Sequence, residues 1–129
     1  MPFVTAYYIK NTGDVAVLEE SANFLDGRQL NPGEESYFDL PLDSGTSASL
    51  YEHCVRAIRH AFNYGKHGLP LIGTGDWNDG FDKVGDEGKG ESVWLAFFLY
   101  DILNLFAETA RMHNDVAFAD ECKKQAQQL

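Results

Sequence analysis

Residues 67–85, HGLPLIGTGDWNDGFDKVG, bring together residue types that could do chemistry at close spacing. A short apolar run leads into a segment, Gly73 to Gly85, with four glycines, three aspartates and one tryptophan. Three kinds of site would use this combination: a glycine-rich loop for phosphate, a calcium loop, or a carbohydrate site with an acidic catalyst. A solvated acidic loop without function is the remaining interpretation, and Trp77 between two acidic residues counts against it.

The dinucleotide and calcium interpretations fail on spacing. Asn78 stands where the third glycine of a dinucleotide-binding fingerprint belongs, and the neighbouring aspartates would repel a pyrophosphate. Counted from Asp76 as position 1, an EF-hand loop would need an oxygen ligand at Gly80 and a glycine at Phe81. We therefore expect no metal site in this loop and no bound cofactor.

The carbohydrate interpretation uses every feature of the segment. Sugars are bound by an aromatic face against their C–H groups and by amide and carboxyl groups at their hydroxyls, and Trp77, Asn78 and Asp76 provide both. Glycosidic cleavage needs a carboxylic acid that protonates the departing oxygen. Burial and a like-charged neighbour such as Asp76 would keep Asp79 protonated near neutral pH. On these residues alone, the carbohydrate site and the solvated loop are equally open.

Helices are expected to position this loop, and the hydrophobic periodicity places them in five segments: 4–9, 14–25, 49–65, 91–113 and 114–128. Gly13 and Gly65 are helix-stop residues. Ser49 and Glu52 form a capping-box pattern, which marks the start of the clearest helix. The chain is thus predicted to be mainly α.

The stretch between the second and third predicted helices is less regular in pattern. Residues 26–48 carry several glycines and prolines, so we expect a long irregular connection with at most a short strand or hairpin around Tyr37-Phe38.

The 91–113 helix is apolar on most sides and needs more neighbours than this chain supplies. Glu91 and Ser92 at its start are explained by capping or by the helix dipole. Its aromatic residues are expected in the core: Trp94, Phe97, Phe98 and Phe106.

Whole-chain composition narrows the classes of partner. The chain has 129 residues and a net charge of −10, whereas nucleic acids and anionic membranes attract clustered Lys and Arg, so neither is an expected partner. Asp101 and Asn104 interrupt the longest apolar stretch, 95–106, so we expect no membrane insertion of this segment. The start of the chain has no signal-peptide pattern, and Cys54 and Cys122 lack metal-ligand spacing. Free thiols in the cytoplasm are expected.

The motif HGLPLIGTGDWNDG, followed by VG, GKGESVWL and FFL, resembles the signature of glycoside hydrolase family 94, formerly glycosyltransferase family 36. NTGDVAVLEESANFLDGRQL and SLYEHCVRAI also resemble this family, most closely its cyclic β-1,2-glucan synthase branch. The resemblance covers nearly the whole chain. It implies part of an (α/α)6 barrel of helical hairpins with long irregular loops. Residues 1–129 would be a single fragment of that catalytic domain, with the catalytic loop at about 67–90.

The resemblance also implies inverting phosphorolysis or glycosyl transfer on β-glucans. The general acid of the family corresponds to Asp79, and its motif tryptophan, which contacts the sugar, corresponds to Trp77. Inorganic phosphate would be a co-substrate, an anion that attacks without a second carboxylate to activate it. Phe81 and Asp82 stand where other members carry Met and Asn, which leaves the linkage preference open.

The partners implied are a β-glucan or gluco-oligosaccharide and the rest of the parent catalytic domain, and any membrane anchor of the parent would lie in other segments. The fragment alone is expected to be inactive and to self-associate through the apolar 91–113 helix. A different class of function also fits the residues: a non-catalytic acidic helical module that binds carbohydrate or a protein partner. The resemblance favours the enzyme.

Overall fold

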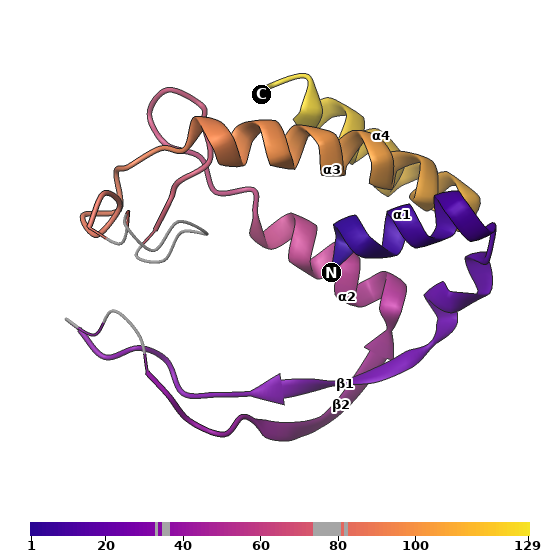
Figure 1. Ribbon diagram of the computed structural model, residues 1–129, viewed down its shortest axis with the longest axis horizontal. Helices are drawn as coiled ribbons and strands as arrows, with labels where there is room; N and C mark the ends of the chain where they lie inside the picture. Colours follow the sequence, from indigo (N-terminus) through magenta and orange to yellow (C-terminus); the bar gives the residue numbers. More distant parts are fainter. Residues whose placement is uncertain (33, 35–36, 74–80, 82) are drawn as a thin grey trace.

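The computed structural model describes residues 1–32, 34, 37–73, 81 and 83–129. Over these residues the chain forms four α-helices, one 3-10 helix and a two-stranded sheet (Figure 1). The α-helices are α1 (Pro2–Thr12), α2 (Leu50–His60), α3 (Val93–Met112) and α4 (Val116–Ala126). The 3-10 helix η1 (Val15–Glu19) leads into strand β1 (Ser21–Asp26), which pairs with β2 (Leu42–Ser49). The mainly α prediction is therefore confirmed, with an antiparallel hairpin added to it.

The core lies where the four helices meet. Phe106 of α3 is fully buried, and its ring centroid lies 5.9 Å from that of Tyr51 in α2 and 6.1 Å from that of Phe118 in α4. Cys54 and Cys122 are both buried in this core as free thiols, as the sequence predicted. Burial raises the pKa of the Cys122 thiol to about 12, so the side chain is a small neutral hydrophobic group.

The helix ends follow the capping signals of the sequence. Gly13, with a φ of 74°, ends α1 in the left-handed conformation that favours glycine. The Ser49 side chain accepts a hydrogen bond from the Glu52 backbone N–H at 3.2 Å, so the first half of the predicted capping box is confirmed. The Glu52 carboxylate instead pairs with Arg56, 2.7 Å away. These caps fix where the chain enters and leaves the helical layer.

The end of α2 differs from the prediction, because the helix stops at His60 and not at Gly65. Residues after His60 pair with the chain that leads into the motif loop: Tyr64 and Pro70 form an antiparallel bridge. The backbone groups of this segment are therefore used for a non-local pairing, which helix signals in the sequence do not report.

The start of α4 is tied to α2. Asp115 caps α4 by accepting a hydrogen bond from the Phe118 backbone N–H at 2.9 Å. Its second carboxylate oxygen accepts a hydrogen bond from the Tyr51 hydroxyl, also at 2.9 Å. The His113 ring stacks on the Tyr51 ring with centroids 3.8 Å apart. The predicted helices over 91–113 and 114–128 are thus confirmed, and a polar network joins the second of them to α2.

The predicted helix over 14–25 is wrong beyond Glu19, because Ser21–Asp26 is a strand. It pairs antiparallel with β2 from Ser21↔Ser49 to Asp26↔Leu42, with an irregularity between Asn23 and Leu25. Tyr37 and Phe38 lie outside both strands, where the sequence allowed at most a short strand or hairpin. The irregular connection predicted over 26–48 is wrong from Leu42 on, because β2 begins there.

A tertiary contact explains the misread strand. Phe24 stands seven positions after Val17, a helical spacing, but its ring packs against α2, 3.9 Å from the His53 ring centroid and 4.5 Å from the Arg56 guanidinium carbon. The His53 ring nitrogen Nε2 also lies 2.9 Å from the carbonyl oxygen of Ala22. His53 therefore joins the hairpin to α2.

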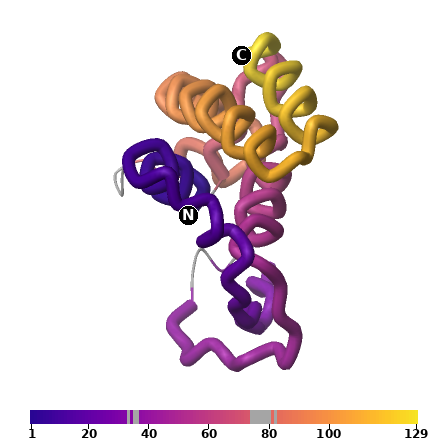
Figure 2. The backbone as a smooth tube through the Cα atoms, turned by 90° about the vertical axis from the view of Figure 1, so that its right-hand side faces the viewer, coloured from indigo at the N-terminus to yellow at the C-terminus, as the bar shows by residue number. Residues whose placement is uncertain are grey.

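The β1–β2 hairpin projects from the helical layer, and α2 lies between it and the α3–α4 pair (Figure 2). The connection between its strands reaches the same end of the molecule as the described part of the 67–90 segment (Figure 1). Large apolar side chains on the hairpin and its connection are exposed: Leu25, Leu30, Phe38, Leu40 and Leu42. A lone two-stranded hairpin is marginally stable in water, and three or more strands or packing against a helix are needed for independent stability.

The N-terminal half of α3 is also uncovered. Phe106 is in the core and Phe98 packs against it, as predicted, but Trp94 is 46% exposed and Phe97 is 73% exposed, so their predicted burial is wrong for this chain. The reason is that α1 and α4 pack on other sides of α3. Val93, Phe97 and Tyr100 instead line a groove of about 300 Å³.

The apolar stretch 95–106 lies within a longer helix. The whole of α3 has 20 residues and, by length and composition, could span a membrane, so the expectation that this segment does not insert into one stays a prediction. Core helices of water-soluble proteins can have the same length and apolar composition, and here α3 packs against α1 and α4.

Candidate functional site

The described parts of the 67–90 segment form a stem at the N-terminus of α3. Three backbone hydrogen bonds hold it, from Leu71 to Asn63, from Ile72 to Gly90 and from Ser92 to Pro70, with N···O distances of 2.9, 2.8 and 2.9 Å. The entering chain therefore lies between the segment after α2 and the segment before α3. Because it bonds to both, the chain enters and leaves the motif through one fixed base.

Glu91 completes this stem with its side chain. Its carboxylate accepts hydrogen bonds from the backbone N–H groups of His67 at 2.9 Å and Leu69 at 3.3 Å, and it lies 3.2 Å from the His67 ring nitrogen Nδ1. The side chain is only 9% exposed. The His67 N–H bond, with the Leu69 N–H bond and the His67 ring in support, holds the pKa of Glu91 below its ordinary value. Glu91 is therefore an ionised acceptor for the turn before the motif.

Glu91 does not have the helix-start role expected from the sequence. Its neighbour Ser92 is the cap of α3, since the Ser92 side chain accepts a hydrogen bond from the Leu95 backbone N–H at 3.1 Å. The prediction is thus confirmed for Ser92, whereas the Glu91 carboxylate turns away from α3 to the motif stem. Gly65 leaves room for it, because a Cβ at that position would overlap the Glu91 carboxylate.

Two glycines allow the stem to close. A Cβ at Gly85 would overlap the Gly73 carbonyl oxygen and the Ile72 side chain, so only glycine fits against the entering chain at this point. A Cβ at Gly90 would lie 2.5 Å from the Val84 carbonyl oxygen. Gly85, one of the four glycines of the segment, thus allows the two ends of the loop to lie close together.

The stem is rigidly packed on one side and open on the other. Pro70 and Ile72 are buried, so the entering chain is fixed against the protein. On the open side, a pocket of about 310 Å³ is lined by Tyr64, Lys66, His67 and Lys89, among others. The geometry therefore presents the loop from a fixed base beside a polar surface.

The residues predicted to act on substrate, Asp76, Trp77, Asn78 and Asp79, lie outside the described residues, as do Gly80 and Asp82. Their roles stay predictions. Over the part of the chain that the structure describes, there is no group of three or more His, Cys, Asp or Glu side chains that could hold a metal ion. The expectation of no metal site in the loop itself remains an expectation.

Sequence reasoning missed the residues that support the motif. Glu91 is separated from His67 by 24 positions, and no local spacing rule links a carboxylate to backbone N–H groups at that distance. Glu91 stands between a glycine and an N-cap serine, which was a weak signal. A carboxylate that complements the helix dipole and one that binds a loop have this same local pattern, so the sequence did not separate the two roles.

Comparison with known proteins assigns the family. The family described as "Glycosyl hydrolase 94 superfamily, catalytic domain" matches residues 1–129. The chain belongs to the glycosyl hydrolase 94 family. The sequence-based resemblance is thereby confirmed over the full length of the chain.

Similar proteins within this family include a cyclic beta-(1,2)-glucan synthase NdvB of Rhizobium meliloti (strain 1021), 41% identical over 111 residues, which cover 85% of this chain and 4% of that protein. A solabiose phosphorylase of Paenibacillus borealis is 40% identical over 111 residues, covering 85% of this chain and 12% of the relative. A 3-O-beta-D-glucopyranosyl-beta-D-glucuronide phosphorylase of the same species is 33% identical over 87 residues, 67% of this chain and 11% of the relative. The chain spans only a small part of the length of these proteins.

Proposed function

We propose that this chain is part of a glycosyl hydrolase 94 catalytic domain in which Asp79 is the general acid. The complete domain would be an (α/α)6 barrel that carries out inverting phosphorolysis or glycosyl transfer on β-glucans. The observation that supports this most is the family assignment over residues 1–129, together with the names of the relatives, a glucan synthase and glycoside phosphorylases.

The uncovered surfaces support a larger domain around this chain. The hairpin and its connection expose Leu25 and Phe38, and α3 exposes Phe97 beside an apolar groove. Monomeric proteins rarely leave contiguous apolar surfaces of this kind without a partner. The rest of the parent catalytic domain is the partner that we propose for them, with additional helices packing on the N-terminal half of α3.

The chemistry uses one acid and one nucleophile. Asp79, as a carboxylic acid, gives its proton to the glycosidic oxygen while the bond from that oxygen to the anomeric carbon breaks. An oxygen of inorganic phosphate forms the new bond to the anomeric carbon from the opposite face, which inverts its configuration. Trp77, Asp76 and Asn78 would hold the sugar at the reacting bond. Phosphate is already an anion, so no second carboxylate is required.

The stem fixes the base of the loop that carries the proposed general acid. The hydrogen bonds of Glu91 to the turn before the motif and the close contact of Gly85 with Gly73 leave the base of the loop little freedom. A positioned acid gains from proximity and orientation, which make up a large part of enzymatic rate acceleration. We infer that the stem serves to position Asp79 in this way.

The cellular setting follows the same proposal. A net charge of −10 supports a neutral glucan and not nucleic acid as the substrate. We propose that the domain acts in the cytoplasm and that membrane attachment, in a synthase-like parent, comes from other segments than α3. Inorganic phosphate enters as a co-substrate and not as a bound cofactor.

Replacement of Asp79 by asparagine in the complete protein tests the assignment. The Asp79→Asn variant keeps the shape but lacks the transferable proton, so phosphorolysis of a β-glucan should fall by at least ~10²-fold. A β-glucoside with a very acidic leaving group should be affected less, because it needs no protonation. Asp86→Asn, an exposed aspartate of the same segment, is the matched control and should keep full activity.

Other outcomes separate the proposal from its alternative. Equal losses on the two substrates would assign Asp79 some other role. Binding of β-glucan by the complete protein without formation of glucose 1-phosphate or glycosyl transfer would instead support the non-catalytic module. The 129-residue chain alone should form no glucose 1-phosphate from phosphate and β-1,2-gluco-oligosaccharides, since a complete barrel is required.

A further inference from the structure

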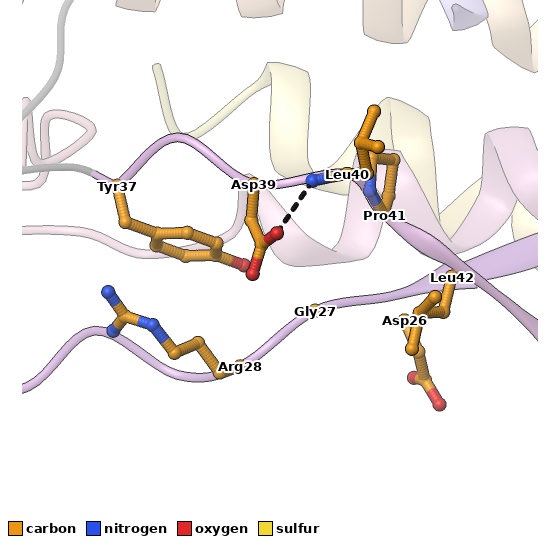
Figure 3. Close-up of a pocket in the computed structure, with 8 residues that line it drawn as sticks. All are labelled: Asp26, Gly27, Arg28, Tyr37, Asp39, Leu40, Pro41 and Leu42. Carbon is orange, nitrogen blue, oxygen red and sulfur yellow. Dashed lines mark hydrogen bonds between the residues drawn. The ribbon is translucent and has the colours of Figure 1, made fainter.

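A second cavity lies away from the motif stem, in the connection between β1 and β2 (Figure 3). It has a volume of about 570 Å³, which falls within the range of about 300–1,000 Å³ for small-molecule sites. Tyr37 and Asp39 line it from the segment that leads into β2, and Asp26 and Arg28 line it from the end of β1 and the residues after it. The hairpin thus brings two polar and aromatic segments together.

Arg28 and Tyr37 are in contact in this cavity. The Arg28 guanidinium carbon lies 4.2 Å from the centroid of the Tyr37 ring. Arg28 also forms a bidentate ion pair with Glu34, with N···O distances of 2.6 and 3.1 Å. The hydrogen bonds from Arg28 keep the pKa of Glu34 below its ordinary value, so the pair is ionised at neutral pH. An aromatic ring beside a carboxylate provides the two kinds of contact that a sugar uses, a face for its C–H groups and an acceptor for its hydroxyls.

The charges around the cavity select the class of ligand. The Glu34 carboxylate neutralises Arg28, and Asp26 and Asp39 add negative charge, so an anion such as phosphate is disfavoured. An apolar ligand would leave the carboxylates without hydrogen-bond partners, which is costly. A neutral ligand rich in hydroxyl groups satisfies both conditions: its hydroxyls donate to the Asp39 carboxylate, and its C–H face lies on the Tyr37 ring.

We propose that this cavity binds a glucosyl unit of a β-glucan chain, remote from the bond that reacts. The inference rests on the proposed function for the choice of glucan. Its location supports it, because the connection between the strands reaches the same end of the molecule as the described part of the motif segment (Figure 1). An extended polysaccharide could therefore contact the hairpin while another of its units occupies the catalytic loop.

Binding of β-1,2-gluco-oligosaccharides to the 129-residue chain tests the proposal by saturation-transfer NMR and calorimetry. The Tyr37→Ala variant should weaken binding by about 10-fold, as expected for truncation of an aromatic anchor. Asp39→Asn, which preserves the shape of the side chain, should also weaken binding. In the unmodified chain only one Asp39 oxygen accepts the Leu40 N–H, at 2.8 Å. Phe38→Ala is the matched control, because Phe38 is fully exposed and does not line the cavity. Circular dichroism of each variant establishes that the fold is retained.

The outcomes distinguish this site from the catalytic loop. Asp79→Asn should leave the Tyr37-dependent binding unchanged. If Tyr37→Ala and Asp39→Asn bind as tightly as the unmodified chain, or if the unmodified chain does not bind, the proposal is overturned while the role of Asp79 stands. Competition by inorganic phosphate would identify an anion site and would also overturn it. Retained Tyr37-dependent binding in a complete protein without catalysis would overturn only the proposed function.

Discussion

The Glu91 carboxylate lies 2.9 Å from the backbone nitrogen of His67 and accepts its hydrogen bond across 24 positions of sequence. This one contact joins the residue before the N-cap of α3 to the turn that precedes the motif. It makes the orientation of the loop dependent on α3, and through Ser92 on the packing of that helix against α1 and α4.

Replacing Glu91 should loosen the stem without unfolding the helices. Glu91→Gln keeps the shape but removes the charge, and hydrogen bonds to charged acceptors are stronger than those to neutral ones. Amide hydrogen exchange at His67 and Leu69 should become faster, while that of the α4 amides should not change. Glu87→Gln, an exposed glutamate of the same segment, is the matched control. Unchanged exchange at His67 in the Glu91 variant would show that the contact does not hold the turn.

Acid should release the same turn. The folded pKa of Glu91 is depressed below its ordinary value of 4.5, so the stabilisation is fully present above about pH 4.5 and is lost as the pH falls through the lower, folded value. Exchange at His67 and Leu69, corrected for its intrinsic pH dependence, should accelerate only below pH 4.5. The Glu91→Gln variant should lack this step, and a step that survives in the variant would assign it to another carboxylate.

Gly85→Ala should disturb the base of the loop more than its small size suggests. Its Cβ would overlap the Gly73 carbonyl oxygen, so the backbone must shift, at a cost of about 1–3 kcal/mol in the free energy of unfolding. Gly13→Ala is the control, since it is strained by its φ of 74° but has no close neighbours. Both variants should melt at lower temperature in calorimetry, and only the Gly85 variant should alter exchange at Ile72. Normal protection of Ile72 in Gly85→Ala would contradict this close contact.

The 129-residue chain alone should self-associate through the uncovered face of α3. Val93→Gln reduces the apolar area of that face, so it should shift sedimentation velocity toward monomer and reduce binding of a hydrophobic dye. Val116→Gln on α4 is closely matched, because Val116 is 59% exposed and Val93 is 58% exposed. Equal effects of the two variants would mean that association is non-specific.

The end of α1 and the start of α2 were predictable because their signals are local, whereas the end of α2 was not. Ser49 and Gly13 act within one turn of the backbone groups that they satisfy, and the segment that became α3 carries its apolar pattern over 20 residues. The apolar pattern of α3 did not indicate which sides of the helix the rest of this chain buries. Phe97 was therefore placed in the core, although the elements that would bury it are not among the four helices described.

The hairpin could not be read from local signals. Ser21 pairs with Ser49 across an intervening connection, and the residues of β1 and β2 are largely exposed and polar, without the alternation that marks a half-buried strand. Phe24 added a misleading helical spacing. At the site, the sequence was sufficient to recognise the motif that contains Asp79, because its residue types are contiguous, whereas the stem depends on pairings between distant segments.

The closed stem also has an evolutionary consequence. Since Ile72 bonds to Gly90 and Ser92 bonds to Pro70, the chain leaves the motif close to where it enters. The free-energy cost of lengthening a loop between two joined ends grows only slowly, by about 0.6 kcal/mol for each doubling. Residues can therefore be added or lost in this segment, outside the motif and the close contact at Gly85, with little strain on the helices. Evolution could vary the surroundings of the loop in this way while its two ends stay in place.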